Sequence, residues 1–275
     1  AHQLQQAGIT LNYDEDYGVL QRRVKNDEEL EHLRAVQKIT EATMEMACSL
    51  IARAPADAEG VLQHEGAALT SERVRQLISR FVLDHDCTTL HDSIVVTVPH
   101  VADCHHFGTG PLRKDLPVIV DIFPTHNHTH YCGDCTRTVV NGDVSDIVRD
   151  MHACVVRANA AGCAALQPGT TGQAVHEAVA AVIREDGYSM GAPTSEKDEE
   201  WIGMRHGTGH GIGLDVHEPI LLATGGGEIL EREVFTVEPG LYSAIHGGVR
   251  VEDMVAVTAT GHENFNQLHS ELDWR

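Results

Sequence analysis

The sequence predicts an α+β fold, in which helices pack against a mostly antiparallel sheet. Helical and strand-like segments come in groups and do not alternate one by one, and this order favours an antiparallel sheet over repeated βαβ units. A pair of helices followed by a group of strands occurs twice, which indicates a loose twofold organisation. With 275 residues, of which 42% are hydrophobic, the chain is long enough to bury a sizeable core.

The first helices are predicted from spacing and end signals. Residues 1–23 lack a clear period and are predicted to be a linker or the remnant of an upstream N-terminal domain, so that the main domain covers residues 24–275. From Asn26 to about residue 54, acidic residues come first and apolar residues follow at close to helical spacing, which predicts a long amphipathic helix. A second helix is expected over residues 70–85, where Thr70 or Ser71 can cap its start.

The rest of the chain is predicted in the same way from short apolar runs and turn residues. Helices are expected where the spacing returns to the helical period, at residues 144–166 and 172–186. Strands are expected at residues 93–99, 117–123, 131–142, 233–242 and 248–258. A glycine-rich passage at residues 203–213 precedes the last two.

Composition excludes several classes of partner and compartment. The net charge of −21 opposes binding to nucleic acid and to anionic membrane surfaces, because phosphate contacts need clustered Lys and Arg. No run approaches the roughly 20 apolar residues of a membrane span, and the first residues lack the features of a signal peptide. Seven cysteines are therefore expected to be free thiols, and the expected compartment is the cytoplasm.

Four acidic residues interrupt apolar strand-like runs, namely Asp121, Asp134, Glu238 and Glu252. A carboxylate buried in a strand costs several kcal/mol unless a cation or a full set of hydrogen bonds compensates it. Only four lysines are present in the chain. The pattern therefore predicts divalent cations, for which carboxylate oxygen is a suitable ligand.

The stretch RHGTGHGIGLDVHEP, residues 205–219, supplies nitrogen donors through His206, His210 and His217. Glycine on either side lets the backbone pass close to a metal or a substrate. The spacing is not H-E-x-x-H, so a zinc site on a helix is not indicated.

The ordered contexts VIVDI, GDCTRT, GHGIGLDVHEP, FTVEPGLY and GVRVEDM resemble those of the pita-bread metallopeptidases, from about residue 24 to the C-terminus. GDCTRT, GVRVED and His206 are more similar to the Xaa-Pro aminopeptidase and prolidase branch than to methionine aminopeptidase. The resemblance implies a curved, mostly antiparallel sheet flanked by helices with pseudo-twofold organisation. Relatives of that branch carry an additional N-terminal domain.

The resemblance also implies a site and a reaction. Two divalent ions, most consistent with Mn, although Co, Zn and Fe also suit, would be held by Asp121, Asp134, His210, Glu238 and Glu252. A hydroxide bridging the two ions would hydrolyse the peptide bond of an Xaa-Pro peptide or dipeptide. Glu238 would also shuttle the proton. The enzyme is expected to be a homodimer.

Further residues are expected to face the substrate. By resemblance, His217 and His206 would contact the substrate carbonyl and the tetrahedral intermediate, and His105 would be a further substrate histidine, with His106 as the alternative one position on. The strand period places Arg250 on the face of Glu252. Arg250 could therefore meet a substrate carboxylate, orient a metal ligand or form a structural ion pair.

Other functions stay open at this point. Methionine aminopeptidase shares the five ligands, whereas a non-catalytic binding module of the same fold or creatinase would lack the metals. A zinc or redox site is a third hypothesis, because THNHTHYCGDC, residues 125–135, holds three histidines and two cysteines. The strand period argues against it, since Cys132 and Cys135 would point to opposite faces, with Cys132 lining the site. The histidines at 126, 128 and 130 would then lie in an enlarged loop near the rim of the site.

Overall fold

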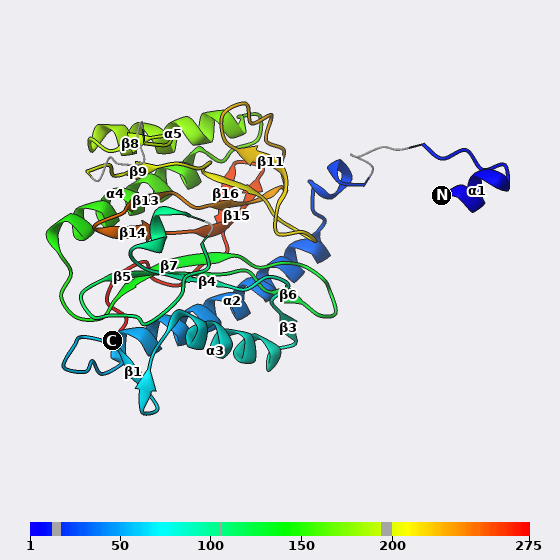
Figure 1. Ribbon diagram of the computed structural model, residues 1–275. Coiled ribbons are helices and arrows are strands. Elements are labelled where there is room, and N and C mark those ends of the chain that lie inside the picture. The colour runs from blue at the N-terminus through cyan, green and yellow to red at the C-terminus, as the bar shows by residue number, and fades with distance from the viewer. Residues whose placement is uncertain (13–17, 105, 194–199) are drawn as a thin grey trace.

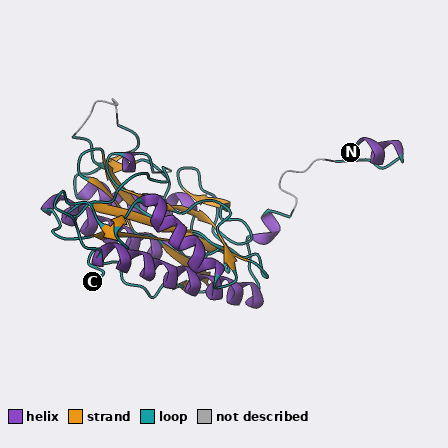
Figure 2. Ribbon diagram, turned by 60° about the horizontal axis from the view of Figure 1, so that its bottom comes forward, coloured by secondary structure: helices purple, strands orange, loops and turns teal. Residues whose placement is uncertain are grey.

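The computed structural model describes residues 1–12, 18–104, 106–193 and 200–275. Figure 1 shows the strands lying between two pairs of helices, one pair on each side. The pairs are α2 (Asp27–Arg53) with α3 (Ser71–Leu83), and α4 (Asp146–Ala165) with α5 (Gly172–Glu185). Figure 2 shows the same layering from another side. The short helix α1 (His2–Gln6) has no buried residue and lies apart from this body in both views.

The strands of the first half form an antiparallel ladder in the order β4-β5-β7, with bounds Ile94–Val96, Pro117–Ile122 and Cys135–Val140. Two small antiparallel pairs also lie in this half. Strands β1 (Gln63–His64) and β2 (Ala67–Ala68) form a hairpin, and β3 (Cys87–Thr88) pairs with the distant β6 (Thr125–His126). The 3-10 helices η1 (Leu20–Arg22) and η2 (His100–Ala102) complete this half.

The strands of the second half form two ladders. One has the order β11-β10-β12-β15-β16, with bounds Glu218–Leu222, Gly209–Gly211, Val234–Val237, Asp253–Thr258 and Gly261–Asn264. The other has the order β14-β13-β9-β8, with bounds Gly247–Arg250, Gly240–Ser243, Gly203–Met204 and Ser189–Met190. Among the described residues, β8 and β9 are parallel and the other paired strands are antiparallel.

Each helix pair closes a hydrophobic core against its strands. In the first half, Met44 and Ile51 of α2 pack with Val120 of β5, and all three are fully buried. In the second half, Met151 of α4 packs with Leu241 of β13. The two halves repeat the arrangement of a helix pair on a set of strands, as the predicted pseudo-twofold organisation requires.

The helix starts follow local side-chain chemistry. Asn26 accepts a hydrogen bond from the amide of Glu29, whose carboxylate accepts one from the amide of Asn26, so α2 begins with a capping box. Thr70 caps α3 through the amide of Arg73. Both starts agree with the sequence-based expectation.

The predicted α+β class is confirmed, and one predicted strand begins later than expected. The run at residues 131–142 forms β7 only from Cys135, because the backbone ahead of it bonds elsewhere: the amide of Cys132 donates to Gly213 and that of Gly133 donates to Pro124. The runs at residues 233–242 and 248–258 each form two strands, β12 with β13 and β14 with β15. Of the strands in the described residues, nine were not predicted, namely β1, β2, β3, β6, β8, β9, β10, β11 and β16. Among the described residues, no helix is both long and apolar enough to cross a membrane.

Candidate metal centre

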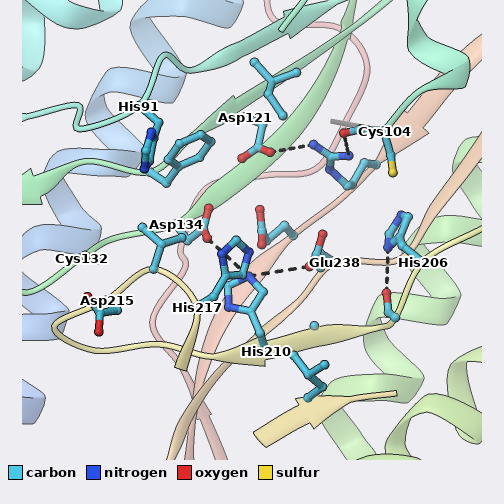
Figure 3. A pocket seen from close by; sticks show the side chains of 18 of the residues that line it. His91, Cys104, Asp121, Cys132, Asp134, His206, His210, Asp215, His217 and Glu238 are labelled. Atoms are coloured by element: carbon cyan, nitrogen blue, oxygen red, sulfur yellow. Dashed lines mark hydrogen bonds and ion pairs between the residues drawn. The ribbon is translucent and has the colours of Figure 1, made fainter. Parts of the chain in front are cut away.

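A cavity of about 630 Å³ opens between strands of both halves, and all five predicted ligands line it. Figure 3 shows Asp134, His210 and Glu238 pointing toward one another in this cavity, with Asp121 nearby. The ligands from the first half lie at residues 121 and 134, and those from the second half lie at 210, 238 and 252. The fold therefore brings together five side chains that are far apart in the sequence.

Two ligands lie within strands and three lie where strands end. Asp121 belongs to β5, opposite Thr136 of β7. His210 lies in β10 between two glycines, and a Cβ at Gly209 would come within 1.9 Å of the carbonyl oxygen of Thr236, so glycine is required for this close strand contact. Asp134 directly precedes β7, Glu238 follows β12, and Glu252 falls between β14 and β15. All three carboxylates line the cavity, and their backbone amides are held by hydrogen bonds to Gln37, Thr208 and Thr136.

Helix α2 fixes the backbone of Asp134. The side-chain amide of Gln37 donates to the Asp134 carbonyl at 2.6 Å and accepts from the Asp134 amide at 3.0 Å. A Cβ at Gly133 would lie 2.2 Å from Oγ1 of Thr40, so only glycine allows the chain to approach the helix this closely. Gln37 was not predicted as a site residue, although a polar residue on the apolar face of a helix is a usable signal.

The imidazole of His210 directs its unprotonated nitrogen, Nε2, toward the carboxylates. Its Nδ1 lies 3.0 Å from the carbonyl oxygen of Gly211, which can only accept, so Nδ1 carries the hydrogen. Burial, with a further contribution from His217, lowers the pKa of His210 to about 3, so Nε2 is unprotonated. Nε2 lies 3.8 Å from an oxygen of Asp134 and 3.8 Å from one of Glu238. This is the tautomer of a metal-binding histidine.

The clustered acids fit a divalent cation. Ligand atoms of Asp134, His210 and Glu252 all lie within 4.8 Å of one another. Burial and the neighbouring carboxylates raise the pKa of Asp134 and of Glu252 well above their usual values. Burial also raises the pKa of Glu238 to about 7, against an opposing effect of Arg250. These acids destabilise one another's charged forms, and bound cations would relieve that cost.

One atom of Asp121 points to the same conclusion. Its Oδ2 accepts a hydrogen bond of 2.6 Å from Nη2 of Arg250, whereas its Oδ1 is buried and has no hydrogen-bond partner among the described residues. A buried carboxylate oxygen without a donor is costly unless a cation binds it. The residues present therefore fit a metal centre.

Arg250 orders the ligands from behind. Besides Asp121, its guanidinium donates to the hydroxyl of Tyr242 at 3.0 Å and to Oγ1 of Thr136 at 3.2 Å. The Thr136 hydroxyl in turn donates to Glu252 at 2.7 Å. Of the roles left open for Arg250, the structure shows the ion pair, which Arg250 forms with Asp121. Thr136 and Tyr242 were not predicted as site residues.

The predicted substrate histidines His217 and His206 both line the cavity. The ring of His217 lies edge-on to that of His210, with centroids 4.1 Å apart. The ring nitrogens of His206 both have protein partners, since Nε2 lies 2.7 Å from the Tyr242 hydroxyl and Nδ1 lies 2.7 Å from the Gly207 carbonyl. Figure 3 shows His206 at the opposite end of the cavity from Cys132.

The predictions for His105 and His106 have different outcomes. His105 lies outside the described residues. His106 does not line the cavity, because its ring stacks on His100 and its Nδ1 accepts from the amide of Gly108. His91 lines the cavity instead, and nothing in its sequence context marked it.

The stretch at residues 125–136 forms no thiol metal site. Cys132 lines the cavity, as expected, and Cys135 packs in the core of the first half. The ring centroids of His126 and His128 lie 5.8 Å apart, with the rings edge-on. The histidines at 126, 128 and 130 do not line the cavity. Among the described residues, no disulfide joins any of the cysteines.

The sequence matches known peptidases. The model of metallopeptidase family M24 matches residues 31–259. The chain is 35% identical over 181 residues to the probable dipeptidase PepE of Mycobacterium bovis, covering 65% of this chain and 45% of that protein. It is 28% identical over 244 residues to an uncharacterized peptidase of Staphylococcus haemolyticus, covering 88% of this chain and 62% of that one. The chain thus spans less than two thirds of the length of these relatives.

Solved structures agree. The Xaa-Pro dipeptidase of Bacillus anthracis superimposes with a TM-score of 0.80 at 26% identity, covering 99% of this chain and 76% of that one. The X-Pro aminopeptidase of Thermotoga maritima superimposes with a TM-score of 0.78 at 26% identity, covering 94% of this chain and 66% of that one. These similarities confirm the predicted pita-bread fold.

Proposed function

The chain belongs to metallopeptidase family M24, and we propose that it hydrolyses Xaa-Pro bonds near the N-terminus of peptides, as an aminopeptidase P or a prolidase does. The observation that carries this proposal is the convergence of all five predicted ligands in one cavity, with His217 beside them. Relatives named dipeptidase, Xaa-Pro dipeptidase and X-Pro aminopeptidase support the same substrate class.

In the proposed site, the divalent ions would be held by Asp121, Asp134, His210, Glu238 and Glu252. When bound, such ions supply Lewis acidity and bring the pKa of a water molecule toward neutrality. Manganese is the proposed metal. Arg250 keeps Asp121 in place through its 2.6 Å ion pair, and Thr136 keeps Glu252 in place through its hydroxyl.

The protein side chains then bind the substrate and move the proton. Glu238 accepts a proton from water and passes it to the leaving nitrogen. His217 donates a hydrogen bond to the substrate carbonyl as negative charge develops on its oxygen. His206 lies farther along the cavity, where Tyr242 orients it.

The cavity wall favours an apolar residue next to the scissile bond. Leu90, Phe107, Phe123 and Leu221 line it, and such a surface suits the ring of proline. Methionine aminopeptidase is the less favoured alternative, because the similar structures named above act on proline bonds according to their names. A non-catalytic binding module is disfavoured by the complete ligand set.

The assembly and compartment belong to the same proposal. We propose a homodimer in the cytoplasm. Seven cysteines without a disulfide among the described residues are consistent with a reducing compartment. Size-exclusion chromatography with light scattering tests the dimer.

A hydrolysis panel tests the function. Purified protein with and without added Mn is given Xaa-Pro dipeptides, longer Xaa-Pro peptides and Met-Ala-Ser peptides. The proposal expects Mn-dependent cleavage of one or both Xaa-Pro sets and little cleavage of the Met peptides. Cleavage of the Met peptides alone would favour methionine aminopeptidase, and cleavage of none would sink the proposal.

A further inference from the structure

The loop at residues 212–217, between strands β10 and β11, is closed by Glu218, the first residue of β11. Oε1 of Glu218 accepts hydrogen bonds from the backbone amides of Leu214 at 3.0 Å and Asp215 at 3.3 Å. A Cβ at Gly213 would lie 2.7 Å from Oε2 of Glu218, so glycine leaves the space that the carboxylate fills. The carboxylate therefore holds both ends of the loop together.

A buried lysine from the other half of the molecule compensates this carboxylate. Nζ of Lys25 lies 3.1 Å from Oε2 of Glu218, and the two residues are only 3% and 2% exposed. The amide of Lys25 donates to the carbonyl of Arg232, which fixes its backbone. Arg22 also lies close, because it pairs with Asp215 at 2.7 Å and its Nε lies 3.6 Å from Oε1 of Glu218, but Arg22 is more exposed than Lys25. Burying this ion pair costs several kcal/mol of desolvation per ion, which offsets much of the attraction between the two charges.

The loop carries residues of the cavity. Leu214, Asp215, Val216 and His217 all line it. Glu218 follows His217 directly, and the His217 ring is the one that packs edge-on against the ligand His210. The position of the His217 ring is thus set by a loop whose closure depends on Glu218. The mechanism proposed above does not use Glu218 or Lys25.

We propose that Glu218 is a positioning residue for His217, and that Lys25 is the counter-ion that keeps Glu218 in place. This inference rests on the proposed function, in which His217 faces the substrate carbonyl. An imidazole displaced by about 1 Å from its working position costs on the order of 10²-fold in rate. Substitution of Glu218 should therefore lower turnover without removing any group that touches substrate.

The chain offers a matched control in Glu233. This carboxylate is also buried, at 1% exposed. It accepts from Nε of Arg23 at 2.5 Å and from the backbone amide of Leu230 at 2.7 Å. It thus pairs with a basic residue of the same N-terminal segment and closes a neighbouring loop, but it does not line the cavity.

The test compares Glu218→Gln with Glu233→Gln, alone and together with His217→Ala, using the Xaa-Pro peptide that the wild-type protein cleaves best. Both Gln variants should lower the midpoint of thermal unfolding. Only Glu218→Gln should lower kcat, by about 10- to 100-fold. The side-chain NH2 group of the glutamine would face the Lys25 ammonium, so two donors would oppose each other and displace the loop that carries His217. In the His217→Ala background, Glu218→Gln should add less than about twofold, since it acts through a ring that is already gone.

Two further measurements keep the outcome clear. Lys25→Met combined with Glu218→Gln removes the clash of donors and should restore much of the kcat lost in Glu218→Gln. Hydrogen exchange of the Leu214 and Asp215 amides in metal-free protein needs no activity and should rise in Glu218→Gln but not in Glu233→Gln. If the wild-type protein cleaves no peptide, the proposed function fails, while exchange still reports on the loop. Unchanged exchange, or equal losses of kcat with and without His217, would overturn the inference.

Discussion

Asp134 and its neighbouring cysteines have opposite environments, although they lie within four positions. Asp134 is 3% exposed and faces His210 and Glu252. Cys132 lies 3.4 Å from the hydroxyl of Thr125, and burial raises the pKa of its thiol. Cys135 packs in the core, where burial raises its thiol pKa well above the usual value. Since the thiolate is the metal ligand and the nucleophile, neither thiol is suited to chemistry.

Substitutions at these three positions should therefore differ sharply. Asp134→Ala removes a carboxylate of the proposed metal centre and should lower kcat/KM by at least about 10³-fold, close to the limit of detection, through loss of charge stabilisation there. Cys132→Ser and Cys135→Ser should keep kcat/KM within about threefold of the wild-type value. Steady-state kinetics with saturating Mn measures both. Full activity in Asp134→Ala, or its loss in both serine variants, would point back to a thiol site.

At the scale of elements, Glu72 connects helix α3 to the loop that precedes β5. Its Oε1 accepts hydrogen bonds from the hydroxyl of Thr109 at 2.6 Å and from the amide of Gly110 at 3.1 Å. The Thr109 hydroxyl is the largest cause that lowers the pKa of Glu72 from 4.5 to about 2. A carboxyl whose pKa is lower in the folded state stabilises that state above its unfolded pKa, and the stabilisation is lost as pH falls toward the folded value.

Glu72→Gln should therefore lower the free energy of unfolding at pH 7 by about 1 kcal/mol, a small value because solvent screens this carboxylate. The difference between the two proteins should stay constant from pH 8 to pH 6 and shrink below about pH 4.5. Urea denaturation at a series of pH values measures it. A difference that grows on acidification would show that the sign is wrong.

Elements with strong local signals could be predicted from the sequence, and those fixed by contacts between distant segments could not. Asn26 and the apolar spacing after it gave the start of α2, and the acids in apolar runs gave four of the five ligands. Strand β10 was not predicted, because glycine disfavours strands. Its Gly209 is needed for the close contact with Thr236, which only the folded chain shows. Gln37, His91 and Glu218 gain their places only when residues far apart in the chain fold together.

At the scale of the whole molecule, the two halves meet at the carboxylates. The first half supplies Asp121 and Asp134, and the second half supplies His210, Glu238 and Glu252, while each half has its own hydrophobic core. Arg250 of the second half is the cation paired with Asp121 of the first. Bound divalent ions would neutralise the remaining charge across the junction and so stabilise the folded chain by mass action.

Metal titration is the most direct test of the metal centre. Protein stripped with EDTA is titrated with Mn while hydrolysis of an Xaa-Pro peptide, bound metal and the thermal unfolding midpoint are followed together. The stripped protein should be inactive, activity should reach its plateau as two Mn bind per chain, and the unfolding midpoint should rise with it. In Asp134→Ala, Mn should neither produce hydrolysis nor raise the unfolding midpoint. Full hydrolysis by metal-free protein, or a plateau reached with no metal bound, would contradict the metal centre described above.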